Sequence, residues 1–232
     1  LRIDRLLVET AICKGEPDWL ADIARLLDPP ADDPRWNRAW ALFWEQAGDT
    51  VEDSERYWQA YLLDLEHLPG LSDPDRRLAQ ALVWERMGEN WVEECDGEDD
   101  EEDEEEDGAA PHARSRAVEC LNKALRLAPR LLSAYTALAK AYQAWGEEKQ
   151  AARTHRRLLE QFPDHFDSLV HLFRYHLSRD EMLQAREYAL RAQALRPANR
   201  EVADMVVAGH AGAARELAHQ GRWEEGRAAL AE

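Results

Sequence analysis

The 232-residue chain has little cysteine, no long apolar run and a deficit of basic residues. Its three cysteines, Cys13, Cys95 and Cys120, lack CxxC spacing, which argues against both a disulfide framework and a zinc site. No apolar stretch approaches 18 residues, so the sequence predicts no membrane span. The formal net charge of −18 and the lack of a basic stripe disfavour nucleic-acid binding.

Catalytic motifs are also missing from the sequence. It contains no GxSxG, P-loop, GxGxxG or HExxH pattern. His165, His171 and His176 are close in sequence, but separations of six and five residues do not keep to one helical face, so structural or surface roles are expected for them. The sequence therefore predicts no enzyme, no cofactor and no metal site.

What the sequence does contain is a repeat. Pro129, Pro163 and Pro197 are 34 residues apart. Two further sets of positions keep the same interval: Ala117, Ala151 and Ala185, and Ala124, Leu158 and Ala192. A period of 34 with small residues inside and proline at the end predicts stacked helical hairpins.

One copy shows how a hairpin forms. Leu138, Ala139 and Tyr142 fall on one stripe of a first helix, and Gly146 is suited to the left-handed position that closes it. Pro163 ends the second helix, because proline lacks an N–H and disfavours helix at the preceding residue.

These residues resemble the tetratricopeptide repeat (TPR) family, most clearly over residues 113–200. The resemblance implies an all-α, right-handed superhelical solenoid of antiparallel hairpins, here about six. The match has departures: His155 stands at an aromatic site, Phe173 at a small site, His176 at the second aromatic site and Asp180 at the glycine site.

Outside that span the pattern drifts. Five glycines are each expected to end a first helix: Gly15, Gly48, Gly88, Gly146 and Gly221. In the first 95 residues a degenerate TPR hairpin is preferred, but a half-a-TPR repeat stays open because Trp40, Phe43, Trp44 and Glu45 also resemble that variant.

Six of the nine tryptophans lie between Trp36 and Trp91. Trp36, Trp40 and Trp44 recur every four residues and so share one helical face. Two interpretations stay open: large rings that fill gaps between irregular helices, and an exposed aromatic strip that anchors a partner.

The second conspicuous feature is an acidic run, in which 13 of the 15 residues from Glu93 to Asp107 are Asp or Glu. Such a block repels itself and is expected to be disordered. About 24 residues are thereby inserted between Gly88 and Ala117, within one predicted hairpin. The run is expected to act as a solvated loop or to attract a basic protein; it lacks the spacing of an EF-hand calcium loop.

The resemblance places the functional surface in the concave groove lined by first helices. A two-carboxylate clamp for a chaperone tail, known in some TPR proteins, is not expected, because its positions fall on Thr136 and Lys140, then His171, then Glu201 and Met205. The predicted partner-binding residues are Thr136, Lys140, Gln143, His171 and Arg174. Lys140 and Arg174 occupy the same repeat position and are expected to project side by side toward an acidic group of the partner.

The predicted organisation has three parts: 1–95 as divergent, tryptophan-rich TPR-like hairpins, 96–112 as an acidic disordered insertion, and 113–232 as TPR repeats truncated at the C-terminal end. The chain begins with Leu1 and ends within an apparent second helix, so an excerpt of a longer polypeptide is expected. The cysteine pattern favours a reducing compartment, so a cytoplasmic location is expected. The predicted function is a scaffold that binds a peptide or partner helix of an unidentified protein. The alternative is an assembly module that stacks on itself or on an adjoining domain.

Overall fold

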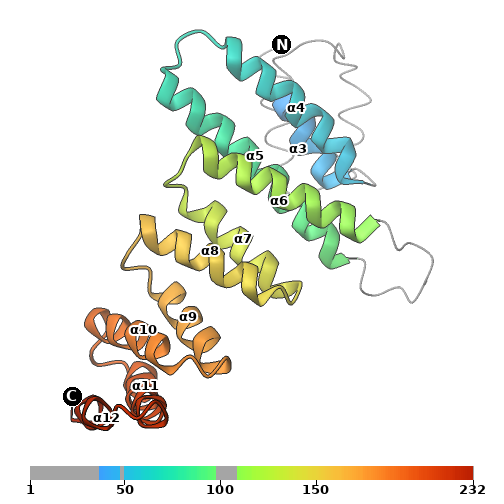
Figure 1. Ribbon diagram of the computed structural model, residues 1–232. Helices are drawn as coiled ribbons and strands as arrows, with labels where there is room; N and C mark the ends of the chain where they lie inside the picture. Colours follow the sequence, from blue (N-terminus) through green and yellow to red (C-terminus); the bar gives the residue numbers. More distant parts are fainter. Residues whose placement is uncertain (1–36, 48–49, 98–108, 232) are drawn as a thin grey trace. The chain divides into compact units, whose positions relative to one another are not determined.

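A computed structural model describes residues 37–47, 50–97 and 109–231, and the chain divides into two compact units, 1–134 and 135–232 (Figure 1). The helices of the first unit are α3 (Asn37–Ala47), α4 (Val51–His67), α5 (Asp73–Gly97) and α6 (Ala109–Leu127). Those that follow are α7 (Leu132–Ala144), α8 (Glu148–Gln161), α9 (Phe166–Ser178), α10 (Met182–Leu195), α11 (Arg200–His219) and α12 (Trp223–Ala229). Within the described ranges there is no strand, and turns of three or four residues join the successive helices from α7 to α12. The predicted all-α class of helical hairpins is confirmed.

The prolines end the second helices as predicted. Helix α6 ends at Leu127, α8 at Gln161 and α10 at Leu195, each two residues before its proline. The equal offset shows that one local rule, the missing proline N–H and the restriction on the preceding residue, ends all three helices.

The first helices of the second unit end in the same turn three times. At Gly146 the backbone has a positive φ of 72°, the N–H of Gly146 donates to the carbonyl of Gln143, and that of Glu147 donates to the carbonyl of Tyr142. This pair of bonds is a Schellman motif, which favours glycine at the left-handed position. Asp180 (φ 58°) and Gly221 (φ 76°) close α9 and α11 with the same two bonds. Asp180 therefore adopts the glycine conformation although it has a side chain.

The expectation for Gly88 is wrong, because α5 runs without a break from Asp73 to Gly97. A Cβ atom at Gly88 would lie 2.6 Å from Cγ of Leu121 on α6, so this glycine allows close helix packing and makes no turn. The first residues of the acidic run are helical as the end of α5, and α6 begins at Ala109. The rest of the run, residues 98–108, lies outside the described residues, as do Gly15, Gly48 and Trp36.

Two tryptophans of the first unit are buried against glutamates. Trp58 donates its indole N–H to Oε1 of Glu45 (2.7 Å), and Trp91 donates to Oε2 of Glu55 (2.7 Å). The Glu55 carboxylate also accepts from Arg116, so this side chain links α4, α5 and α6. A buried carboxylate needs such partners to offset its lost hydration. For these two rings the gap-filling interpretation is therefore supported.

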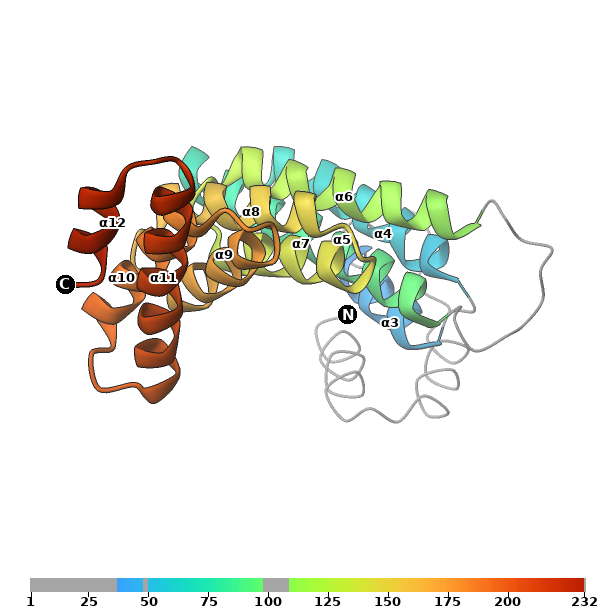
Figure 2. The ribbon, with the colours of Figure 1, turned by 60° about the horizontal axis from the view of Figure 1, so that its bottom comes forward.

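Small residues let the helices of the second unit approach closely. Ala185, Ala189 and Ala192 of α10 are fully buried between α9 and α11. On α11, a Cβ atom at Gly209 would stand 3.0 Å from the backbone Cα of Arg186, which cannot rotate away. The α10–α11 and α11–α12 pairs are packed against each other (Figure 2).

Candidate functional site: a cavity lined by α7 and α9

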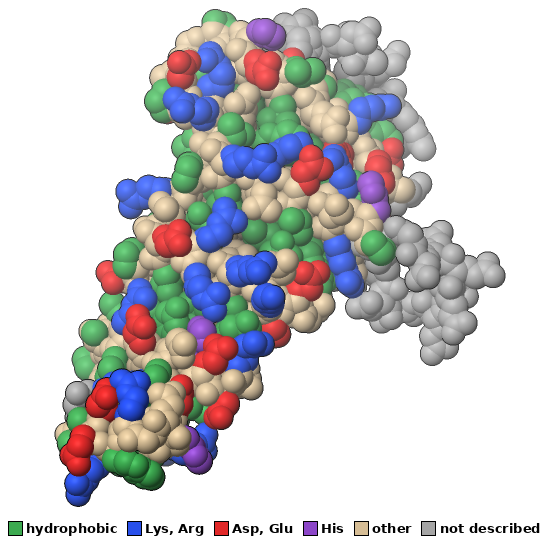
Figure 3. Space-filling model, in the orientation of Figure 1, with side chains coloured by type: hydrophobic (Ala, Val, Ile, Leu, Met, Phe, Trp, Pro, Cys, Tyr) green, Lys and Arg blue, Asp and Glu red, His purple; other side chains and the backbone are tan. Residues whose placement is uncertain are grey.

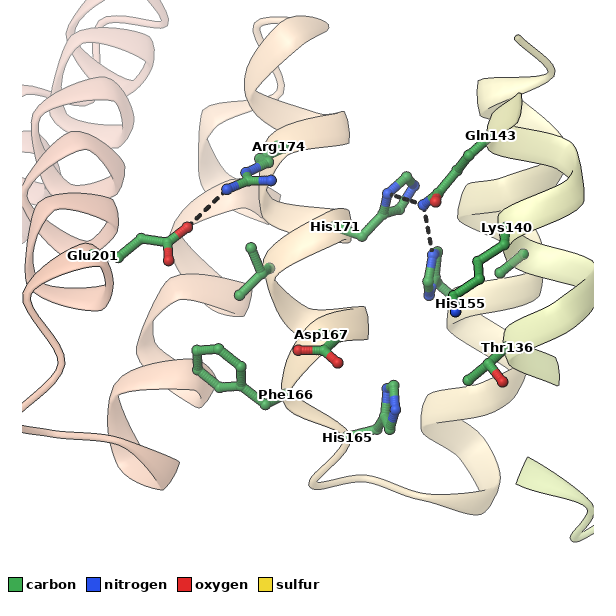
Figure 4. A pocket seen from close by; sticks show the side chains of 12 residues that line it. Thr136, Lys140, Gln143, His155, His165, Phe166, Asp167, His171, Arg174 and Glu201 are labelled. Atoms are coloured by element: carbon green, nitrogen blue, oxygen red, sulfur yellow. Dashed lines mark hydrogen bonds and ion pairs between the residues drawn. The ribbon is translucent and has the colours of Figure 1, made fainter. Parts of the chain in front are cut away.

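A cavity of about 390 Å³ lies in the second unit, between side chains of α7 and α9 (Figure 4). All five predicted partner-binding residues line it: Thr136, Lys140, Gln143, His171 and Arg174. The first three come from α7 and the other two from α9. The five residues predicted from the TPR resemblance are therefore brought together by the fold.

Helical spacing explains this gathering. Thr136, Lys140 and Gln143 are four and three residues apart, so they share one face of α7. Arg174 is 34 residues beyond Lys140 and takes the same place on α9. The apolar part of the lining comes from Ala139, Phe166 and Val170.

The two predicted cations differ in their surroundings. Arg174 Nη2 lies 2.7 Å from Oε1 of Glu201 at the start of α11, with 69% and 54% of the two side chains exposed. An exposed pair like this contributes little to stability, but it turns the guanidinium toward Glu201. Lys140 is exposed and has no ion pair among the described residues. Arg174 therefore does not stand as an unpaired cation beside Lys140.

The other two clamp positions have also been placed. Glu201 lines the cavity at its Arg174 end, and Met205 is buried in the core of the second unit. An acidic and a buried apolar side chain replace the two cations that the clamp would need there.

A chain of hydrogen bonds runs along the cavity wall and joins α7, α8 and α9. The Nε2 atom of Gln143 lies 3.1 Å from Nε2 of His155 and 2.7 Å from Nδ1 of His171. On its other side, Nδ1 of His155 lies 2.8 Å from Oγ of the fully buried Ser168, which is 2.9 Å from Nδ1 of His165. The His155 and His171 rings are 4.1 Å apart between centroids.

Burial keeps these imidazoles neutral. Loss of solvent lowers the pKa of His155 to about 3, and the neighbouring His171 and His165 lower it further. Burial also lowers the pKa of His171; Glu148 opposes that shift and Arg174 adds to it. At neutral pH both rings therefore act through one donor and one acceptor nitrogen.

Sequence reasoning missed part of this cluster. The sequence predicts His155 only as a substitute for a core aromatic, and no pattern in it points to Ser168. Phe166, Asp167 and Val170 were also not predicted to line the cavity. Histidines at 155, 165 and 171 fall on two helices and the turn between them, so no single helical period could reveal the cluster.

Other kinds of site find no support in the part of the chain that the structure describes. No group of three or more His, Cys, Asp or Glu side chains there could hold a metal ion. None of the described helices is long and apolar enough to cross a membrane. Burial raises the pKa of the Cys120 thiol to about 12, with Glu55 adding to the shift, which disfavours a reactive thiolate.

The chain was compared with known proteins at three levels. No protein-family model matches it, and no curated protein matches it. Among solved structures, it is similar to one described as the assembly chaperone of RpL4 (Acl4), residues 1–338. That similarity has 16% sequence identity and a TM-score of 0.31, and covers 94% of this chain and 96% of the other. It assigns no partner to this chain.

Proposed function

We propose that this chain is a TPR-like protein-interaction scaffold that binds a peptide segment of a partner protein in the cavity of α7 and α9. The observation that carries the proposal is that the five residues predicted from the TPR resemblance line one cavity. The repeated Schellman turns and the constant proline offset support the TPR-like assignment.

The lining suits a peptide. Ala139, Phe166 and Val170 offer an apolar surface for a side chain, and Lys140 offers a charged donor beside it. Three of the twelve lining residues are apolar and nine are polar or charged, and placed polar groups fix the orientation of a ligand in a binding site. Peptide grooves between helices use this combination to gain affinity from apolar contact and orientation from polar contact.

The test begins with selection of random 12-residue peptides displayed on phage against the full 232-residue chain. Selected peptides are expected to lose about tenfold in affinity on Lys140→Glu, measured by fluorescence anisotropy, because a charge-assisted hydrogen bond becomes a repulsion. Lys149→Glu is the matched control, since Lys149 is exposed on α8 and lies outside the cavity. Equal loss in both variants, or no loss in either, would place binding elsewhere.

A second candidate, self-assembly, is supported by the α11–α12 hairpin. Val207, Trp223 and Leu230 are 69%, 65% and 64% exposed, and Trp223 and Leu230 are seven residues apart, on one face. Exposed large apolar side chains on one hairpin favour contact with another surface. Sedimentation equilibrium should then show a concentration-dependent mass that Trp223→Glu abolishes and Leu63→Glu, at an equally exposed position of α4, preserves. A constant monomer mass at all concentrations would exclude this candidate.

A further inference from the structure

The side-chain amide of Gln143 has two ends with different surroundings. Its nitrogen faces two imidazole rings, His155 and His171, whereas its oxygen has no hydrogen-bond partner among the described residues; Gln143 itself lines the cavity (Figure 4). The orientation of this amide decides whether Gln143 presents a hydrogen-bond donor or an acceptor to a ligand in the cavity. The hydrogen bonds of the cluster settle that orientation, starting from a backbone group whose direction the helix determines.

The starting point is the first turn of α9. The backbone N–H of Ser168 donates to Nδ1 of His165, which acts as the N-cap of the helix. Nδ1 of His165 therefore carries no proton. Because Oγ of Ser168 is 2.9 Å from the same nitrogen, the hydroxyl proton must point toward it.

The remaining protons then follow in order. The single hydroxyl proton of Ser168 is already donated to His165, so Oγ can only accept from Nδ1 of His155. A neutral His155 then has a bare Nε2, which can only accept, and the group of Gln143 that faces it must be the NH₂. The second N–H of that amide donates to Nδ1 of His171, whose own proton is then on Nε2, a buried atom 4.0 Å from Glu148 that has no hydrogen-bond partner among the described residues.

We propose that Gln143 is a specificity-determining residue of the cavity: held as an acceptor by His155 and His171, its oxygen takes a main-chain N–H of an extended peptide and rejects a carboxylate or carbonyl at that place. This inference rests on the proposed function. It specifies what the cavity recognises at this position, which is a hydrogen-bond donor of the peptide and not a net charge.

The surroundings of Gln143 agree with recognition of the main chain of a peptide. Lys140 lies three residues earlier on the same face and offers a donor, so the two side chains present a donor and an acceptor to a backbone in which C=O and N–H alternate. The cavity also holds one acidic side chain without an ion pair in the described part, Asp167, which offsets the charge of Lys140. On the visible face, acidic and basic side chains are interspersed with apolar ones (Figure 3). In the cavity itself, Lys140 and Asp167 bring one charge of each sign, so charge of one sign does not select the partner.

The first experiment determines the tautomers in the full, unliganded chain. Long-range ¹H–¹⁵N correlation spectra at pH 7 distinguish a proton on Nδ1 from a proton on Nε2 of each histidine. The expected result is Nδ1–H for His155 and Nε2–H for His165 and His171. A proton on Nε2 of His155 would overturn the inference, because Gln143 would then have to face that ring with its oxygen.

The second experiment uses a peptide selected from the random library that responds to Lys140→Glu. Each backbone N–H is replaced in turn by an ester oxygen. One replacement is expected to weaken binding roughly three- to tenfold in the wild type and to have no further effect in Gln143→Met. Gln184→Met, at an exposed site on α10, is the control that keeps the full sensitivity.

The outcomes separate the two claims. If a cavity-binding peptide tolerates every ester replacement, Gln143 does not read an N–H and only the inference is overturned. If no selected peptide responds to the cavity variants, the proposed function fails and the inference fails with it. Gln143→Met leaves two ring nitrogens without donors, so Gln143→Glu is used as a second variant. A carboxylate can only accept hydrogen bonds, so this variant should raise the pKa of a neighbouring imidazole, which NMR titration measures.

Discussion

Acidification should destabilise the second unit through His155. Its pKa is about 3 in the folded chain because the ring is buried, whereas an unfolded histidine titrates near pH 6.5. Between these two values the unfolded chain binds a proton that the folded chain does not, so stability falls as the pH falls. The penalty is absent above pH 6.5, grows below it and levels off near pH 3. From pH 7 to pH 5 this one ring should cost about 2 kcal/mol.

Methionine methyl groups allow each unit to be followed separately. Met182 and Met205 lie in the second unit and Met87 in the first, and they are the three methionines of the chain. Urea unfolding followed by ¹³C-methyl signals at pH 7 and pH 5 gives the stability of each unit. His155→Gln should lower stability at pH 7 but lose about 2 kcal/mol less than the wild type on acidification. His219→Gln, which removes an exposed histidine of α11, is the control.

The result that refutes this reasoning is an equal loss of stability in the wild type and in His155→Gln between pH 7 and pH 5. Titration of the His155 ring near pH 6.5 would refute it as well. Either outcome would mean that the folded chain accommodates the charged ring, against the burial and the hydrogen bonds described above.

Three further substitutions test the packing. Asp180→Gly should raise the stability of the second unit by about 0.5–1 kcal/mol in urea unfolding, because glycine adopts the positive φ without strain; a loss would mean that the exposed Arg215 pair matters more. Gly209→Ala should cost about 1–3 kcal/mol despite the better helix propensity, and an unchanged thermal midpoint would refute the close approach to Arg186. Glu55→Ala should cost about 1–3 kcal/mol in the Met87 signal, since it leaves the buried indole N–H of Trp91 unpaired and removes one of the two carboxylates that pair with Arg116; wild-type stability would show that water replaces the carboxylate.

The features that could be predicted from the sequence are those decided within a few residues. A proline ends a helix, and a left-handed residue closes one, through backbone geometry alone, so the ends of α6, α7, α8 and α10 agree with the repeat register. The face of α7 that carries Thr136, Lys140 and Gln143 was equally predictable, because it needs only the helical period.

The features that were missed depend on contacts between helices. Gly88 looks like a turn residue in the sequence, but its role is set by Leu121, 33 residues later on α6. Arg174 looks like an unpaired cation until Glu201 from α11 is placed beside it. The histidine cluster likewise exists only once α7, α8 and α9 are packed, since its members share no helical face.

The contacts of Gln143 with His171 and of His155 with Ser168 cross the boundary between the α7–α8 hairpin and the next hairpin. In repeat proteins, stability is the sum of the intrinsic stability of each repeat and a coupling to its nearest neighbours. Apolar contacts supply most such coupling and tolerate exchange of one repeat for another. Here side-chain hydrogen bonds add to the coupling at the α8–α9 boundary. Separation of α9 from α8 must therefore break these hydrogen bonds as well as the apolar contacts. The two hairpins should therefore unfold as a single cooperative block, and a hairpin transplanted from elsewhere in the array should not restore that cooperativity.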